Sequence, residues 1–188
     1  MGDITANFSC WEFAPKMLGA ERKNWKPLPV QAVMIRHMAV MILQPIRDEF
    51  GEVNITSGVR TLTDYTRLID AGYHPSWKSD HYFGACVPVP VTHQPQFGAS
   101  FPWTCGAVDI QVNDHMRDAF HWMQDKLDPG RYGQIIYEVQ TRADGTEAHW
   151  IHIGNPRLLV YSAAVADTLP VKTPVLMGIN GRYTRYER

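Results

Sequence analysis

Apolar residues recur at spacings of three and four over residues 30–50, the longest helical pattern in the chain. The pattern consists of Val30, Val33, Met34, His37, Met38, Met41 and Ile42, and Ile46 and Phe50 continue it in phase. Such spacings predict an amphipathic helix with one face toward a core. Pro45 lies inside the pattern. Because a proline removes a helical hydrogen bond and clashes with the preceding turn, we expect the helix to kink or end there.

Three further helices are predicted from their capping signals. Ser9 is followed three residues later by Glu12, and Thr61 by Asp64, which is the pattern of a capping box. The second of these helices should cover residues 61–70 and stop at Gly72. Asn113 or Asp114 is expected to cap a third helix. The apolar face of that helix comprises Met116, Ala119, Phe120, Met123 and Leu127.

Strand-like runs alternate with these helices. They cover residues 52–58, 107–112 and 158–162, and a hairpin is predicted from residues 133–140 and 149–154. Antiparallel strands that follow one another in sequence, with helices between them, indicate an α+β fold. We expect a small antiparallel sheet flanked by helices.

The segment of about residues 85–105 differs from the rest of the chain. It is rich in proline and aromatic residues, it shows no period, and Cys86 and Cys105 bracket it. A loop of this length in a compact domain is often functional, so we interpret it as an inserted loop or lid. The two cysteines could meet across its neck, where a reducing compartment would keep them as thiols. We assign residues 1–157 to one domain and residues 158–188 to a C-terminal extension that needs a surface to settle on.

Composition narrows the classes of partner. The net charge is −1 and no long basic run occurs, which argues against nucleic acid as a partner. No apolar stretch is long enough to span a bilayer. Met1 to Thr5 lack the basic start and apolar run of a signal peptide. We therefore expect a protein that is made in a cytoplasm, with no role in a membrane.

Four side chains with metal-site chemistry stand beside strand-like apolar residues. They are His81, Asp109, Glu138 and His152. A catalytic zinc site needs three protein ligands, an open position for water, and a carboxylate that takes the proton of that water. Each residue also has an ordinary explanation, because a lone histidine is more often a surface or hydrogen-bonded core residue. Taken together, the four residues lead us to interpret the chain as a zinc peptidase.

This interpretation makes a demand on the predicted hairpin. Side chains alternate along a strand, so a two-residue turn at Asp144-Gly145 would turn His152 away from the face of Glu138. A three-residue loop over 143–145, with Gly145 left-handed, pairs Glu138 with Trp150 and keeps His152 diagonal to it on one face. A zinc site therefore requires the three-residue loop or an equivalent bulge. Gln134 and Ile136 would share that face.

The motifs around these residues resemble a known family. The stretches Ser79-x-His81-x-x-Gly84, Ala107-x-Asp109, Tyr137-Glu138 and Trp150-x-His152 are similar to motifs of the D-alanyl-D-alanine carboxypeptidase family of zinc peptidases. That family includes the vancomycin-resistance dipeptidases and the phage L-alanyl-D-glutamate endolysins, and it shares its fold with the hedgehog signalling domain. Phe8-Ser9-x-x-Glu12-Phe13, Leu43-Gln44-Pro45-Ile46-Arg47 and Thr56-Ser57-Gly58-Val59-Arg60 extend the similarity to roughly residues 7–155. One departure is the segment of about 85–105, because the family places its aspartate a few residues after the first histidine.

The resemblance implies a role for each matching residue. It makes His81, Asp109 and His152 the Zn²⁺ ligands and Glu138 the general base. Arg60 would hold a substrate carboxylate or the scissile carbonyl, and Ser79, Gln134 and Trp150 are candidates for binding substrate. The implied substrate is the stem peptide of bacterial peptidoglycan. We therefore expect a phage-encoded cell-wall hydrolase of the endolysin or virion-associated kind. It would be made in the host cytoplasm and act on the cell wall.

Two alternatives stay open at this point. A virion structural protein could retain the peptidase fold without activity, with the insertion and the C-terminal tail as docking surfaces for other virion proteins. An iron oxygenase is the other, since two histidines and one carboxylate also describe its facial triad. Those enzymes commonly place the first two ligands as His-x-Asp and need no base at Glu138.

Overall fold

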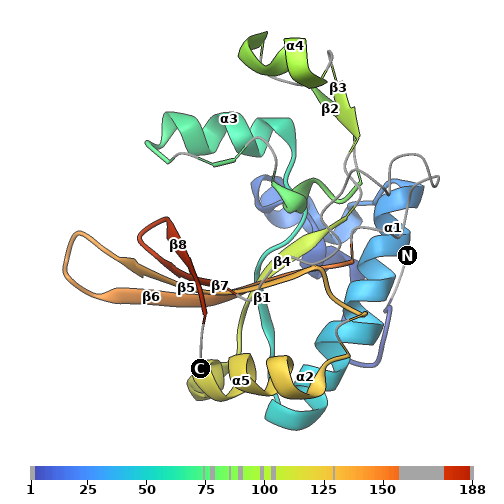
Figure 1. Ribbon diagram of the computed structural model, residues 1–188. Helices are drawn as coiled ribbons and strands as arrows, with labels where there is room; N and C mark the ends of the chain where they lie inside the picture. The colour runs from blue at the N-terminus through green and yellow to red at the C-terminus, as the bar shows by residue number, and fades with distance from the viewer. Residues whose placement is uncertain are drawn as a thin grey trace.

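A six-stranded sheet occupies the centre of the protein (Figure 1). The computed structural model describes residues 3–73, 75–76, 79–84, 86–88, 91–97, 100–102, 105–128, 130–156 and 176–186. In spatial order the strands are β1 (Asn54–Ser57), β4 (Ala107–Gln111), β6 (Glu147–Gly154), β5 (Gln134–Thr141), β7 (Leu176–Ile179) and β8 (Arg182–Arg185). With helices on the sheet, the fold is α+β, as expected from the sequence.

The sheet is mixed, so the expectation of a purely antiparallel sheet is wrong in one pairing. β5 and β7 run parallel, whereas the other neighbouring strands are antiparallel. The last residue of β6, Gly154, lies beside the first residue of β5, Gln134. The first residue of β7, Leu176, lies beside Ile136, close to the same end of β5. β7 therefore runs antiparallel to β6 and parallel to β5, which lies between them.

The predicted long helix forms and passes through Pro45 without ending. It consists of α1 (Pro29–His37), a π-helical segment η3 (Met38–Leu43) and α2 (Gln44–Phe50). A proline cannot donate to the carbonyl four residues back and its ring crowds that carbonyl. The π-helical geometry just before Pro45 widens the turn and removes this conflict. Gly51, with φ of 81°, ends the helix instead.

The buried stripe of this helix is displaced from the predicted one. Its fully buried members are Met34, Ile35, Met38, Ala39, Ile42, Leu43 and Ile46. Val33, which the predicted pattern included, is 58% exposed. Gln31, Met34, Ile35 and Met38 keep the three- and four-residue spacing of a regular α-helix, so the buried face of α1 lies one position beyond the predicted one.

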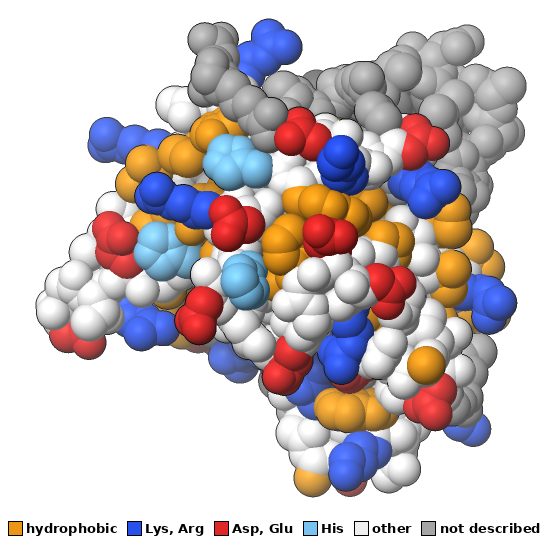
Figure 2. Space-filling view, turned by 90° about the horizontal axis from the view of Figure 1, so that it is seen from below, with side chains coloured by type: hydrophobic (Ala, Val, Ile, Leu, Met, Phe, Trp, Pro, Cys, Tyr) orange, Lys and Arg blue, Asp and Glu red, His pale blue; other side chains and the backbone are white. Residues whose placement is uncertain are grey.

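The remaining helices lie on opposite sides of the sheet. α3 (Leu62–Asp70) lies above it in Figure 1, while α2 and α5 (Met116–Lys126) lie below. Figure 2, which views the molecule from below, shows acidic and basic side chains interspersed around apolar ones on the described part of that face. The core is formed where α1, α2 and α5 meet the lower face of the sheet, and its buried residues include Ile110, Phe120, Met123 and Ile151.

Two of the three predicted helix caps are present. The Ser9 N–H donates to Glu12 Oε2 at 2.7 Å at the start of η1 (Cys10–Phe13), which precedes a second 3₁₀ segment, η2 (Lys16–Asn24). Thr61 Oγ1 accepts from the Asp64 N–H at 3.1 Å, and the Thr61 N–H donates to Asp64 Oδ2 at 2.9 Å.

The cap predicted at Asn113 or Asp114 is wrong. Residues 113–115 form a 3₁₀ turn, η6 (Asn113–His115), and α5 begins only after it, at Met116. No side chain caps α5. Instead Met116 Sδ accepts the Val112 N–H at 3.1 Å, which closes the connection between β4 and the turn.

The inserted segment has more regular structure than the expected loop. β2 (Cys86–Pro88) and β3 (Ser100–Pro102) form an antiparallel ribbon, which leads to η5 (Val91–His93) and α4 (Gln94–Phe97). In Figure 1 this ribbon stands away from the central sheet. The two ends of the insertion meet, because Gly106 packs against the ring of Phe83 so closely that a Cβ would collide with it. The Cys86 side chain lies outside the described residues, so the expected meeting of Cys86 and Cys105 across the neck of the insertion lies outside them too.

The C-terminal segment joins the same sheet. β7 and β8 are connected by Asn180 and Gly181, which both have positive φ, of 49° and 76°. The Asn180 N–H donates to the Val139 carbonyl at 2.9 Å, and the Thr141 N–H donates to Asn180 Oδ1 at 2.9 Å. The C-terminal extension therefore packs along β5, which would be the edge of the sheet without it. The strand predicted over 158–162 lies outside the described residues, and none of the described helices could cross a membrane.

Candidate metal centre

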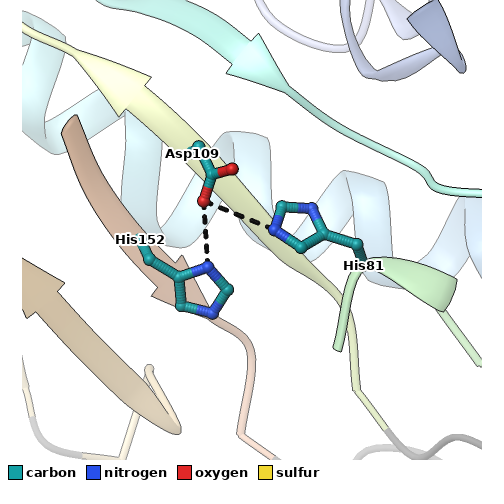
Figure 3. Close-up of side chains that lie close together, drawn as sticks. All are labelled: His81, Asp109 and His152. Carbon is teal, nitrogen blue, oxygen red and sulfur yellow. Dashed lines mark hydrogen bonds and ion pairs between the residues drawn. The ribbon is translucent and has the colours of Figure 1, made fainter. Parts of the chain in front are cut away.

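Three side chains from three separate elements converge on the upper face of the sheet (Figure 3). His81 comes from the 3₁₀ turn η4 (Asp80–Tyr82), Asp109 from β4 and His152 from β6. Asp109 and His152 are direct cross-strand partners. Their side chains therefore lie next to each other on one face of the sheet.

The spacing of the ligand atoms suits a single ion. His152 Nδ1 lies 2.9 Å from Asp109 Oδ1, and His81 Nε2 lies 3.3 Å from the same oxygen. All three ligand atoms lie within 4.8 Å of one another. Zinc bonds of about 2.0–2.1 Å in a tetrahedron place neighbouring ligand atoms about 3.3 Å apart. The group could therefore hold a metal ion with small side-chain adjustments.

The backbone fixes His81 in the tautomer that a metal ligand needs. His81 Nδ1 lies 2.8 Å from the carbonyl oxygen of Gly58, which can only accept, so Nδ1 carries the proton. In the neutral imidazole, Nε2 is then the nitrogen with the free lone pair, and it faces Asp109. A ligating histidine usually has such a second partner, which orients its ring. Gly58 itself packs against the Phe13 backbone too tightly for any Cβ.

Electrostatics in the group are dominated by one carboxylate between two imidazoles. Burial alone would raise the pKa of Asp109, but the adjacent His81 and His152 outweigh it and hold that pKa well below its ordinary value. Burial would lower the pKa of His152, but the hydrogen bond and the charge of Asp109 raise it overall. Asp109 thus stays anionic, as a metal ligand must be.

Glu138 stands diagonal to His152 on the same face. Glu138 pairs with Trp150 and Ile136 pairs with His152. The hairpin loop consists of residues 143–145, since the Arg142 N–H donates to the Thr146 carbonyl at 2.8 Å and Gly145 has φ of 80°. The three-residue loop that the zinc interpretation required is therefore present. Burial is the main reason that the pKa of Glu138 is raised, with nearby Asp109 acting in the same direction.

A cleft of about 560 Å³ opens over these residues. All eight residues singled out from the sequence line it: Arg60, Ser79, His81, Asp109, Gln134, Glu138, Trp150 and His152. Arg60 Nη1 donates to Ser79 Oγ at 3.1 Å, and the Arg60 N–H donates to the His81 carbonyl at 2.8 Å. Arg60 follows β1 and Glu138 lies on β5, so the strands that carry Asp109 and His152, β4 and β6, lie between them in the sheet.

Part of this cleft is formed by residues that were not predicted from the sequence. Leu68 and Tyr73, from α3 and the residues after it, form part of the wall, and Leu176 and Tyr183 contribute from the C-terminal hairpin. The Asn180-Gly181 pair was the available signal for that hairpin, because this dipeptide strongly favours a two-residue hairpin turn. The flanking strands are only four residues long, which is too short for a clear alternation of apolar and polar residues.

Comparisons with known proteins add no family assignment. No protein-family model matches the chain, and no curated protein and no solved structure shows significant similarity to it.

Proposed function

We propose that this protein is a zinc-dependent peptidase that cleaves the D-amino-acid-containing stem peptides of bacterial peptidoglycan. The observation that carries the proposal is the convergence of His81, Asp109 and His152 in one cleft that also contains Glu138. Two imidazoles and one carboxylate form a donor set typical of catalytic zinc. The substrate class, and the role of a phage-encoded wall hydrolase, rest on the motif resemblance.

The mechanism assigns proton transfer to Glu138. A zinc ion held by the three ligands would supply Lewis acidity and lower the pKa of a bound water to about 7. Glu138 would accept a proton from the attacking water and pass it to the leaving amine. Its raised pKa supports this role, because a carboxylate that shuttles a proton works best with a pKa closer to the working pH.

Arg60 would bind the substrate on the other side of the ligands. Its guanidinium can hold a carboxylate or the carbonyl under attack, through two parallel N–H donors. The hydrogen bond to Ser79 restricts the guanidinium to the cleft. Gln134 and Trp150 would contact the peptide from the floor of the cleft.

The test is digestion of purified muropeptides, analysed by mass spectrometry with and without a chelator. We expect cleavage that the chelator abolishes and zinc restores. The Glu138→Ala variant should keep its zinc and lose cleavage, by a factor of roughly 10²–10⁴. Undiminished cleavage by that variant would remove Glu138 from the mechanism. Wild-type protein that binds zinc but cuts nothing would favour the virion structural role.

A further inference from the structure

One row of residues crosses four strands of the sheet beside the metal centre. Trp150 on β6 lies opposite Glu138 on β5, Glu138 lies opposite Gly178 on β7, and Gly178 lies opposite Tyr183 on β8. Because direct cross-strand partners point to the same side, Glu138 and Tyr183 both face the cleft with only Gly178 between them. Both side chains line the cleft.

Gly178 leaves the space that lets these two side chains meet. A Cβ at this position would lie 2.8 Å from Tyr183 Cε1 and 3.3 Å from Glu138 Cγ. The ring of Tyr183 therefore crosses over β7 where any other residue would place a side chain. Its hydroxyl reaches Glu138 and donates to Oε2 at 3.3 Å.

The Tyr183 hydroxyl keeps its proton at neutral pH and therefore acts as a hydrogen-bond donor. Burial, followed by the charge of Glu138, raises the pKa of Tyr183 to about 12. The phenol therefore keeps its proton, and the hydrogen bond runs from tyrosine to carboxylate. A glutamate side chain has three rotatable bonds, so a carboxylate without such a partner would sample several orientations.

We propose that Tyr183 is a positioning residue for Glu138, so that the C-terminal hairpin β7–β8 completes the candidate active site. The hydroxyl would hold the carboxylate at Oε2 from β8, together with the Trp150 side chain, which also hydrogen-bonds Glu138 from β6. This inference rests on the proposed peptidase function for its catalytic part, whereas the contact itself does not depend on activity.

The kinetic test compares two tyrosine variants of the zinc-loaded protein on muropeptides. Tyr183→Phe removes the hydroxyl and keeps the ring, and we expect kcat to fall about ten-fold with KM nearly unchanged. Tyr186→Phe is the matched control from the same segment. Its ring packs against Phe120, with centroids 5.2 Å apart, and no hydrogen bond of its hydroxyl to another described residue is seen. The control should keep the wild-type kcat.

A second measurement needs no activity. In the chelator-treated protein, Tyr183→Phe, Glu138→Ala and the double variant form a cycle of urea unfolding experiments. We expect the two changes to be non-additive by about five-fold in the unfolding equilibrium constant. Gly178→Ala adds a Cβ that displaces the Tyr183 ring, and it should lower kcat in the wild-type background more than in Tyr183→Phe.

The outcomes separate this inference from the proposed function. A wild-type kcat in Tyr183→Phe, or additive unfolding energies, would overturn the role of Tyr183 and leave the peptidase intact. Wild-type protein that holds zinc and cuts no muropeptide would overturn the peptidase and with it the catalytic role of Tyr183, and the unfolding cycle would still decide whether the hydroxyl holds Glu138.

Discussion

Zinc should raise the thermal stability of this protein through His81, Asp109 and His152. An ion that binds the folded state alone stabilises it by RT ln(1 + [M]/Kd), which is about 2.7 kcal/mol at a free concentration of 100 Kd. For a chain of 188 residues, each kcal/mol raises the unfolding midpoint by about 2–4 °C. We therefore expect a rise of about 5–11 °C when zinc is returned to chelator-treated protein.

Two histidine variants on the same strand make this measurement specific. His152→Ala removes a candidate ligand and should abolish the rise in differential scanning fluorimetry. His149→Ala is the matched control, because His149 also lies on β6 but faces the opposite side. There it contacts the Tyr137 hydroxyl at 3.1 Å and Glu147 at 3.2 Å. This control should keep the rise, although it too removes one imidazole from the unfolded chain.

The dependence on pH has a definite sign. The pKa of His152 is raised in the folded protein, so the folded state holds its proton longer than the unfolded state does. Stability of the metal-free protein should then fall as the pH rises above about 6.5, the ordinary histidine value. The raised pKa of Glu138 acts in the same direction. Zinc must displace the proton of His152, so the stabilisation by zinc should grow over the same range.

The carboxylate of Asp109 changes the stability of the folded protein only at acidic pH. Because its pKa is lowered, its contribution to stability is present above its ordinary value of about 3.9 and is lost as the pH falls through the folded value.

A zinc-dependent rise in the unfolding temperature that persists in His152→Ala would refute the proposed ligand set. A rise that disappears equally in His149→Ala, or that shrinks between about pH 6 and pH 8, would refute it as well.

Substitutions at three further positions test the scaffold and the substrate side of the cleft. Arg60→Ala should raise KM for muropeptides about ten-fold or more, and Arg60→Lys should restore little, because an ammonium cannot form two parallel bonds; an unchanged KM would exclude Arg60 from substrate binding. Asn155→Ala should cost about 1–3 kcal/mol in urea unfolding, because Asn155 is 1% exposed and donates to the Met34 carbonyl at 2.9 Å. Thr61→Ala should cost about 1 kcal/mol through the lost cap of α3, and Thr61→Ser should recover most of it.

Local rules explain which elements could be predicted from the sequence. The capping boxes at Ser9 and Thr61 depend on residues three apart, so no tertiary contact had to be known. The hairpin loop followed from a requirement of parity, because only an odd loop lets Glu138 and His152 share a face. The same parity argument grouped Gln134 and Trp150 with them.

The errors arise where distant parts of the chain decide local structure. The prediction for the long helix failed at Val33 because hydrophobic spacing could not show that polar Gln31, together with Ile35, lies on the buried face of α1. The parallel pairing of β5 with β7 depends on where the chain returns after β6. Spacing along the sequence does not contain that information.

The cleft owes its chemistry to the direction in which successive strands present their side chains. Asp109 and His152 meet because they are direct partners, Glu138 follows on the same face through a three-residue loop, and Tyr183 follows through a two-residue turn and the gap at Gly178. A change of one residue in either connection would turn one functional side chain toward the core. Both connections use glycine with positive φ, at Gly145 and Gly181. Left-handed backbone at these two positions therefore keeps the candidate base and its tyrosine partner on the face that carries the metal ligands.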